Sequence, residues 1–122
     1  HPMTKTLTAS NIRYLLIMQR LDPENKGTRC TDVAEKLKCS KPSVHNMMHT
    51  LRDMGIIRRD AYGESFFTEE GRALAERYSR YFDAVASLLA DQFPEDDLLS
   101  GVCAFLSEMP EAALASLEKK VG

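Results

Sequence analysis

The sequence predicts a mainly helical fold with one small β-hairpin near its middle, and three observations carry that prediction. Most of the 122 residues fall into segments whose apolar positions repeat every three or four residues, as on one face of a helix. The breaks between these segments hold residues that typically start or end helices, such as Ser40, Gly55 and Pro94. One stretch departs from the helical period, because β-rich runs flank Ala61-Tyr62-Gly63.

The first helix is predicted within residues 8–21, which start with two possible caps, Thr8 or Ser10, and are apolar at most positions. Residues 22–27 (DPENKG) form a polar turn. A short second helix follows, with Thr31 as its expected cap.

A three-residue break at 38–40 separates this helix from a third one, which Ser40 caps and in which Pro42 occupies the first turn. Gly55 is placed to end the third helix in a left-handed conformation. One apolar stripe runs along it, made of Val44, Met47, Met48, Leu51 and Met54.

Residues 56–60 and 64–67 are predicted to pair as a hairpin. Thr68 then caps a long helix that runs to about Gln92. Two shorter helices follow, opened by Pro94 and Pro110, and both carry apolar positions at helical spacing.

The order of helix, short helix, tight turn, helix and hairpin is that of a winged helix-turn-helix domain. We therefore divide the chain into a DNA-binding domain over residues 4–72 and a short all-helical dimerisation domain over residues 73–122. The third helix (40–54) is the expected recognition helix, because its outward face carries hydrogen-bonding side chains suited to a major groove. The candidate DNA contacts are Arg29, Thr31, Ser40, Lys41, Pro42, Ser43, His45, Asn46, His49, Thr50, Arg58, Arg59 and Tyr62.

Composition and charge fit this division. The net charge of −2 hides an excess of five positive charges in residues 3–60 and of seven negative charges in residues 61–122. Because the phosphate backbone responds to a local field, the basic half fits double-stranded DNA as its partner. An uneven distribution of charge over helix surfaces with no function is the alternative.

Cysteine usage and hydropathy indicate the compartment. The three cysteines are an odd number without a CxxC spacing, which fits a reducing cytosol better than a disulfide framework. No stretch approaches the roughly 18 consecutive apolar residues of a membrane span. We expect a cytoplasmic protein without a membrane partner.

Residues 31–76 (TDVAEKLKCSKPSVHNMMHTLRDMGIIRRDAYGESFFTEEGRALAE) resemble the DNA-binding domain of the diphtheria-toxin-repressor family of metal-sensing regulators, the DtxR and MntR group. The resemblance extends over about residues 8–120, because residues 79–120 are similar to that family's dimerisation helices in length, spacing and apolar pattern. It implies a short member without an SH3-like domain. The winged helix alone would also fit the MarR group.

The resemblance implies Mn²⁺ or Fe²⁺ as a cofactor, yet this chain departs from the family at the metal ligands. The family's ligand positions fall on Arg13, Leu16, Phe82, Cys103, Leu106 and Ser107. Of these, only Cys103 is a metal ligand, and one thiolate cannot hold such an ion. We therefore assign no metal site. Asp83 and Glu108 lie beside the expected positions, so a rebuilt site stays open. Arg13, Phe82, Asp83 and Cys103 mark the region where an effector would act, and Arg13 is expected to pair with an acid such as Asp83.

Two further signals have alternative interpretations. His45 and His49 have the HxxxH spacing of helix-borne metal ligands, but a DNA contact is the preferred interpretation. Cys39, beside the basic Lys41, is the cysteine expected to act if one of the three is a redox sensor, and all three would otherwise be small apolar core residues.

No catalytic motif is present, so an enzyme is not expected. The sequence predicts a homodimeric transcription regulator of the DtxR-like kind, most simply a repressor, which binds a pseudo-palindromic operator. Two alternatives stay open, a Mn²⁺- or Fe²⁺-responsive repressor with a rebuilt site and a winged-helix module that binds proteins and no longer binds DNA. Whether the effector is a metal, a small ligand or a thiol reaction, or whether there is none, also stays open.

Overall fold

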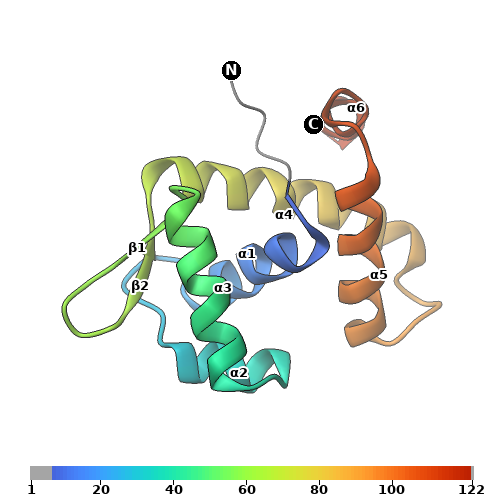
Figure 1. The fold of residues 1–122 in the computed structure, drawn as a ribbon. Coiled ribbons are helices and arrows are strands. Elements are labelled where there is room, and N and C mark those ends of the chain that lie inside the picture. The colour runs from blue at the N-terminus through green and yellow to red at the C-terminus, as the bar shows by residue number, and fades with distance from the viewer. Residues whose placement is uncertain (1–6, 122) are drawn as a thin grey trace. The chain divides into compact units, whose positions relative to one another are not determined.

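The structure is a computed structural model that describes residues 7–121 (Figure 1). It is mainly helical with one two-stranded antiparallel sheet, which confirms the predicted fold class. In chain order the elements are α1 (Ala9–Leu21), α2 (Cys30–Leu37), α3 (Lys41–Asp53), β1 (Ile57–Arg59), β2 (Ser65–Phe67), α4 (Glu69–Leu89), α5 (Glu95–Glu108) and α6 (Glu111–Val121).

The chain forms two compact units. Residues 14–76 make one unit, and the residues before Tyr14 together with those from Arg77 onward make the other. Residues 4–6, where the predicted DNA-binding domain begins, and Gly122 lie outside the described residues. The assignment of DNA binding to residues 4–72 and of dimerisation to residues 73–122 stays a prediction.

In the unit of residues 14–76, α2 contacts α3 and α3 contacts β1. Figure 1 shows the β1–β2 hairpin extending past α3 to its turn. Arg58 pairs with Phe66 at the centre of the hairpin. The core of this unit is apolar and combines α1, α2, α3 and the first strand; its fully buried side chains include Leu15, Leu16, Ile17, Met18, Val33, Val44, Met48, Leu51, Ile56 and Ile57.

The segment before α2 is joined to the hairpin. The backbone N–H of Thr28 donates to the carbonyl oxygen of Ser65, and the N–H of Ser65 donates back to Thr28, each at 2.8 Å. This isolated antiparallel bridge adds one backbone pair to the sheet. It also fixes where α2 begins: the helix starts at Cys30, with Arg29 as N-cap in an extended conformation and without a side-chain cap bond. The prediction that Thr31 caps this helix is therefore wrong.

The hairpin is followed directly by α4, and Thr68 makes the connection. Its hydroxyl donates to the carbonyl oxygen of Gly55 at 2.7 Å and accepts from the N–H of Gly71 at 3.0 Å, which confirms Thr68 as the predicted cap. Gly55 has φ +79°, the left-handed conformation predicted for the end of α3. Gly71 is buried, and a β-carbon there would overlap the carbonyl oxygen of Ile56.

The second unit contains the beginning of α1, the later part of α4, and helices α5 and α6. Thr8 caps α1, because its hydroxyl accepts from the N–H of Asn11 while the Asn11 side chain accepts from the N–H of Thr8, both at 3.0 Å. The buried apolar side chains of this unit include Ile12, Tyr78, Tyr81, Phe82, Val102, Cys103, Leu106 and Leu114.

Two ion pairs join α4 to α6. Arg77 contacts Glu111 at 3.3 Å, and Arg80 contacts Glu118 at 2.6 Å. Beneath them the rings of Tyr78 and Tyr81 meet edge to face at 5.2 Å between centroids. Burial raises the pKa of both tyrosines above the usual range, and nearby carboxylates raise it further, Glu111 at Tyr78 and Glu118 with Glu111 at Tyr81.

The helix after the hairpin is shorter than predicted. It ends at Leu89 instead of continuing to about Gln92, and the N–H of Gln92 donates to Leu89 in a turn. Pro94 disfavours a helical conformation at Phe93, so the chain turns before α5 starts. The predicted openings of the last two helices at Pro94 and Pro110 agree with the observed starts at Glu95 and Glu111. None of the described helices is long and apolar enough to cross a membrane.

Candidate nucleic-acid interface

The turn between α2 and α3 is built by three residues. Lys38 takes up the left-handed conformation at φ +57°, and its N–H donates to the carbonyl oxygen of Ala34. Ser40 then caps α3, accepting from the N–H of Ser43 at 3.2 Å. Pro42 occupies the first turn, where no N–H is needed. This local chemistry explains the abrupt change of direction between the two helices of a helix-turn-helix.

Helix α3 has one buried and one exposed face. Val44, Met48 and Leu51 are fully buried, while Met47 and Met54 of the predicted stripe are half-buried at its edges. The opposite face is open to solvent and consists of Lys41, Pro42, Ser43, His45, Asn46, His49, Thr50 and Asp53. The candidate contacts predicted on this helix therefore lie together on one exposed surface, which we call the α3 face.

The side chains of the α3 face differ in how they are already bonded. The hydroxyls of Ser43 and Thr50 bond within the helix, to Ser40 and to the carbonyl oxygen of Asn46. Within the described part of the chain, Lys41, Asn46 and His49 make no side-chain hydrogen bond or ion pair. These three side chains keep their hydrogen-bonding capacity for a ligand.

The hairpin presents a second exposed group. The guanidinium carbon of Arg58 lies 4.5 Å from the centroid of the Phe66 ring, a cation–π contact across the two strands. At the turn the Asp60 carboxylate accepts from the N–H groups of Tyr62 and Glu64, both at 2.9 Å. This turn leaves the Tyr62 side chain 91% exposed.

Of the three remaining candidates on the hairpin and near the start of α2, the two arginines are partly engaged in contacts within the protein. Arg59 is half-buried and donates to the carbonyl oxygen of Gly63 at 3.1 Å. Arg29 is exposed and lies 3.8 Å from Asp32, and Thr31 is exposed beside it. Of the three hairpin residues predicted to contact DNA, Arg58 and Tyr62 are therefore more accessible than Arg59.

One side-chain cluster joins α2, α3 and β1. The Cys30 sulfur lies 3.8 Å from Nδ1 of His45 and 3.7 Å from Nη2 of Arg59. Sequence reasoning placed the candidate thiol at Cys39 instead. Cys39 is exposed, and its sulfur lies 3.7 Å from the Tyr14 hydroxyl. The signal that points to Cys30 is its position at the first residue of α2, which became visible only with the true start of that helix.

The metal positions implied by the family resemblance do not fit a metal. No three His, Cys, Asp or Glu side chains in residues 7–118 come together as an ion would require. His45 and His49 do not form such a group, and the Arg59 cation beside Cys30 and His45 opposes a metal ion at that end of α3.

The effector region predicted around Arg13 differs from expectation in one contact. Asp83 is exposed and makes no ion pair with Arg13 among the described residues; Arg13 is half-buried, and its Nε has no hydrogen-bond partner there. The predicted Arg13–Asp83 pair is therefore wrong, because Asp83 follows the buried Phe82 onto the outer side of α4. Phe82 and Cys103 are buried in the core of the same unit.

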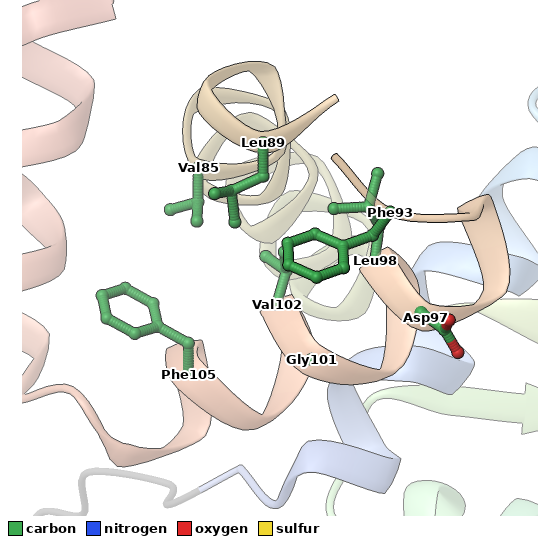
Figure 2. A pocket seen from close by; sticks show the side chains of 8 residues that line it. All are labelled: Val85, Leu89, Phe93, Asp97, Leu98, Gly101, Val102 and Phe105. Carbon is green, nitrogen blue, oxygen red and sulfur yellow. The ribbon is translucent and has the colours of Figure 1, made fainter. Parts of the chain in front are cut away.

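The same unit has an apolar hollow of about 600 Å³ between the end of α4 and α5 (Figure 2). Figure 2 shows the rings of Phe93 and Phe105 at its rim. The residues that line it are Val85, Leu89, Phe93, Asp97, Leu98, Gly101, Val102 and Phe105. Together with the neighbouring Leu88, which is 80% exposed, they form a surface that we call the α4–α5 apolar surface.

Residues 12–61 match the model of the IclR helix-turn-helix domain. No curated protein sequence matches the chain. The matched segment contains α2, the turn, α3 and β1, the elements that carry the α3 face. The chain thus contains a helix-turn-helix domain of the DNA-binding kind.

Solved structures similar to this one share its fold at low sequence identity. The hypothetical protein SSo2273 from Sulfolobus solfataricus has 18% identity and a TM-score of 0.65, over 95% of this chain and 90% of that one. IdeR from T. acidophilum has 19% identity and a TM-score of 0.68, over 98% of this chain and 56% of that one. The manganese regulator SloR has 20% identity and a TM-score of 0.73, over 98% and 54%. This chain therefore spans little more than half the length of these two regulators.

The comparisons support a DNA-binding regulator with a winged helix, and not an enzyme. IdeR and SloR belong to the diphtheria-toxin-repressor family, so the resemblance to that family is found at the level of the fold. The sequence match itself is to the IclR helix-turn-helix domain.

Proposed function

We propose that this protein is a homodimeric, sequence-specific transcription regulator, a repressor, that reads a pseudo-palindromic operator with one α3 helix in each major groove. The observation that carries the proposal is the α3 face, on which Lys41, Asn46 and His49 are exposed without internal partners. An amide such as that of Asn46 can form two hydrogen bonds with adenine, and Lys41 can bind guanine or phosphate.

The hairpin supplies the second contact in this proposal. Arg58, stacked on Phe66, and Tyr62 at the turn would approach the DNA backbone or minor groove beside α3. The Ser43 hydroxyl accepts from Ser40, so it can still donate its proton to DNA. The Thr50 hydroxyl donates to the carbonyl oxygen of Asn46, so it can act as an acceptor or through its methyl group. We assign sequence reading to Asn46 and His49, and charge-based docking to Lys41 and Arg58.

The experiment that tests DNA binding is a fluorescence anisotropy titration with labelled 30-base-pair duplexes of randomised sequence, followed by selection of the tightest binders. A docking surface that neutralises phosphates must lose affinity steeply as salt rises. On a selected duplex, Asn46→Ala is expected to cost about tenfold or more in affinity and to relax preference at one base position. The matched control is Glu35→Ala, an exposed position on α2 outside the α3 face.

Two results would contradict the proposal. An anisotropy that does not change with any duplex at low salt would contradict DNA binding and favour the winged-helix module that binds proteins in place of DNA. A DNA affinity that Lys41→Ala and Asn46→Ala leave untouched would contradict the α3 face as the surface that binds DNA.

The proposed dimer rests on the α4–α5 apolar surface. Leu88, Phe93 and Phe105 are 80%, 54% and 47% exposed, a large apolar area for one part of a short chain. A second copy of the chain is the occupant we propose, because a symmetric dimer would present two α3 helices to a palindromic site. Figure 2 shows the hollow beside these rings, which an apolar side chain of the partner would fill.

Sedimentation velocity of the full chain tests the dimer. We expect a dimer at micromolar concentration and a monomer after Phe105→Asp, because a carboxylate at an apolar interface is costly to bury. Leu21→Asp, at an exposed leucine of the other compact unit, is the control and should leave the assembly unchanged. A wild-type monomer at high micromolar concentration would rule the dimer out.

A further inference from the structure

The cluster of Cys30, His45 and Arg59 has a chemistry that DNA binding does not use. Cys30 is the first residue of α2, and its side chain is buried, with 7% of the residue exposed. Its sulfur lies 3.8 Å from His45 Nδ1 and 3.7 Å from Arg59 Nη2. A nucleophilic sulfur at the positive end of a helix thus contacts both a base and a fixed cation.

We propose that hydroperoxides oxidise Cys30. In this reaction His45 accepts the thiol proton and passes it to the leaving oxygen, and the Arg59 guanidinium stabilises the oxygen that is added to the sulfur. In the neutral imidazole with the proton on Nε2, Nδ1 can accept the thiol proton. The sulfur attacks one peroxide oxygen, so an S–O bond forms as the O–O bond breaks. The leaving oxygen takes the proton from His45 and departs as water when the oxidant is hydrogen peroxide. The sulfur loses two electrons, the peroxide gains them, and Cys30 becomes a sulfenic acid.

The side chain of Arg59 is placed to stabilise that product. Its Nη2 is anchored on the carbonyl oxygen of Gly63 at 3.1 Å. Its Nε is buried and has no hydrogen-bond partner among residues 7–118. A buried guanidinium N–H without an acceptor is costly, and an oxygen added to the neighbouring sulfur is a better acceptor than the sulfur itself.

The other two cysteines lack this arrangement. Cys39 is exposed beside the Tyr14 hydroxyl, and no basic side chain contacts its sulfur in the described part of the chain. Cys103 is buried in the core of the second unit. Cys39 is the better target for a bulky alkylating reagent because it is exposed, whereas Cys30 has the groups that assist attack on a peroxide.

The position of Cys30 links oxidation to the surface proposed for DNA. The cluster ties α2 to the α3 face through His45 and to the hairpin through Arg59. An added oxygen at a buried sulfur must displace at least one of these side chains. This link rests on the proposed function: oxidation of Cys30 lowers the affinity for DNA, and reduction restores it.

The first experiment tests reactivity and does not involve DNA. The full-length wild-type protein is treated briefly with hydrogen peroxide and then denatured in the presence of dimedone, so that the reagent reaches buried and exposed sulfenic acids alike, and the modified cysteine is identified by peptide mass spectrometry. We expect Cys30 to be labelled at least about tenfold faster than Cys39. His45→Gln and Arg59→Gln should each slow labelling of Cys30 and leave Cys39 unchanged. His49→Gln, one turn further along α3, is the matched control.

Preferential labelling of Cys39, or equal rates at Cys30 in wild type and both cluster variants, would overturn the oxidation site. Because wild-type peptides are compared within one protein, this result does not depend on whether any cysteine variant folds.

The second experiment measures DNA affinity before and after peroxide, then after dithiothreitol, on a duplex selected as above. A reversible loss in the wild type that Cys30→Ser abolishes, and that Cys39→Ser retains, supports the link. Labelling at Cys30 with unchanged affinity would keep the oxidation site and reject the link. If the reduced protein binds no duplex, the proposed function fails, and the labelling experiment still decides the oxidation site.

Discussion

The side chain of Asn25 pairs with the backbone of Phe67 as a neighbouring strand would. Its amide nitrogen donates to the carbonyl oxygen of Phe67 at 3.1 Å, and its amide oxygen accepts from the N–H of Phe67 at 2.9 Å. Asn25 itself is left-handed, with φ +58°, a conformation that asparagine tolerates better than most residues. One side chain therefore fastens the turn after α1 to the last residue of β2.

Removal of this side chain should destabilise the unit of residues 14–76. Asn25→Gly keeps the left-handed backbone accessible but leaves both polar groups of Phe67 unpaired, at a cost of about 2 kcal/mol. The free energy of unfolding of the wild type and of Asn25→Gly, both determined in urea, measures this cost. Lys26→Ala, at the exposed neighbour, is the control. A loss below about 0.5 kcal/mol for Asn25→Gly, within the range of ordinary surface substitutions, would contradict the structural role.

Two glycines in helices should respond in opposite directions to alanine. At Gly71 the β-carbon would overlap the Ile56 carbonyl oxygen, so Gly71→Ala is expected to lower stability by about 3 kcal/mol. At Gly101 no atom of the described residues beyond the adjacent backbone of α5 lies within 4 Å of the added carbon, so Gly101→Ala should raise helix stability by about 1 kcal/mol. Thermal unfolding of the two variants measures the difference. Equal shifts in Tm would show that the backbone at Gly71 can move aside.

Stability should fall as the pH rises above 10. Burial and the nearby Glu111 carboxylate raise the pKa of Tyr78 above the unfolded value of 10.0. Above that pH the unfolded chain loses the phenolic proton first, so the folded state binds more protons and unfolding becomes easier. The contribution of Tyr78 to the free energy of unfolding is fully present below pH 10 and is lost as the pH rises through the pKa of Tyr78 in the folded protein.

Tyr78→Phe is the variant that tests this dependence. It should flatten the decline in the unfolding free energy between pH 9 and pH 11. Tyr62→Phe, at a side chain that is 91% exposed, is the control. An unchanged slope in Tyr78→Phe would assign the alkaline loss to other groups.

The hairpin arginine should contribute to the salt dependence of DNA binding. If Arg58 contacts a phosphate, Arg58→Ala should reduce the slope of log K against log salt by about 1 and weaken all duplexes alike. Arg80→Ala removes the same charge from the other compact unit, where Arg80 pairs with Glu118, and serves as control. An equal change of slope in both variants would mean that the effect is one of total charge.

The helical elements and the exposed face of α3 were predictable because their signals are local. Ser40, Pro42 and Gly55 each fix the conformation of one or two residues, and the structure has all three in the expected roles. The exposed face of α3 followed from the buried stripe on its opposite side. The role of Thr68 as the cap of α4 was also predictable, because a helix cap is a local signal.

What the sequence did not reveal depends on contacts between distant residues. Thr28 and Ser65 are far apart in the chain, and their backbone bridge sets the start of α2 one residue before Thr31. The grouping of Cys30 with Arg59 needs both the helix start and the strand register. The absence of an Arg13–Asp83 pair depends on which side of α4 faces the core. Consecutive residues of a helix point in different directions, so Phe82 is buried while Asp83 is exposed.

The bridge between Thr28 and Ser65 also bears on how the hairpin can vary in length. The base of the β1–β2 hairpin is held on both sides, because Phe67 pairs with Ile57 and Ser65 pairs with Thr28. Insertions near that base would shift the register and turn side chains to the wrong face. The tip between Asp60 and Glu64 is closed by local bonds alone, so extra residues are tolerated there. The hairpin can therefore be lengthened or shortened by engineering at its tip, while its base and the neighbouring α3 keep their places.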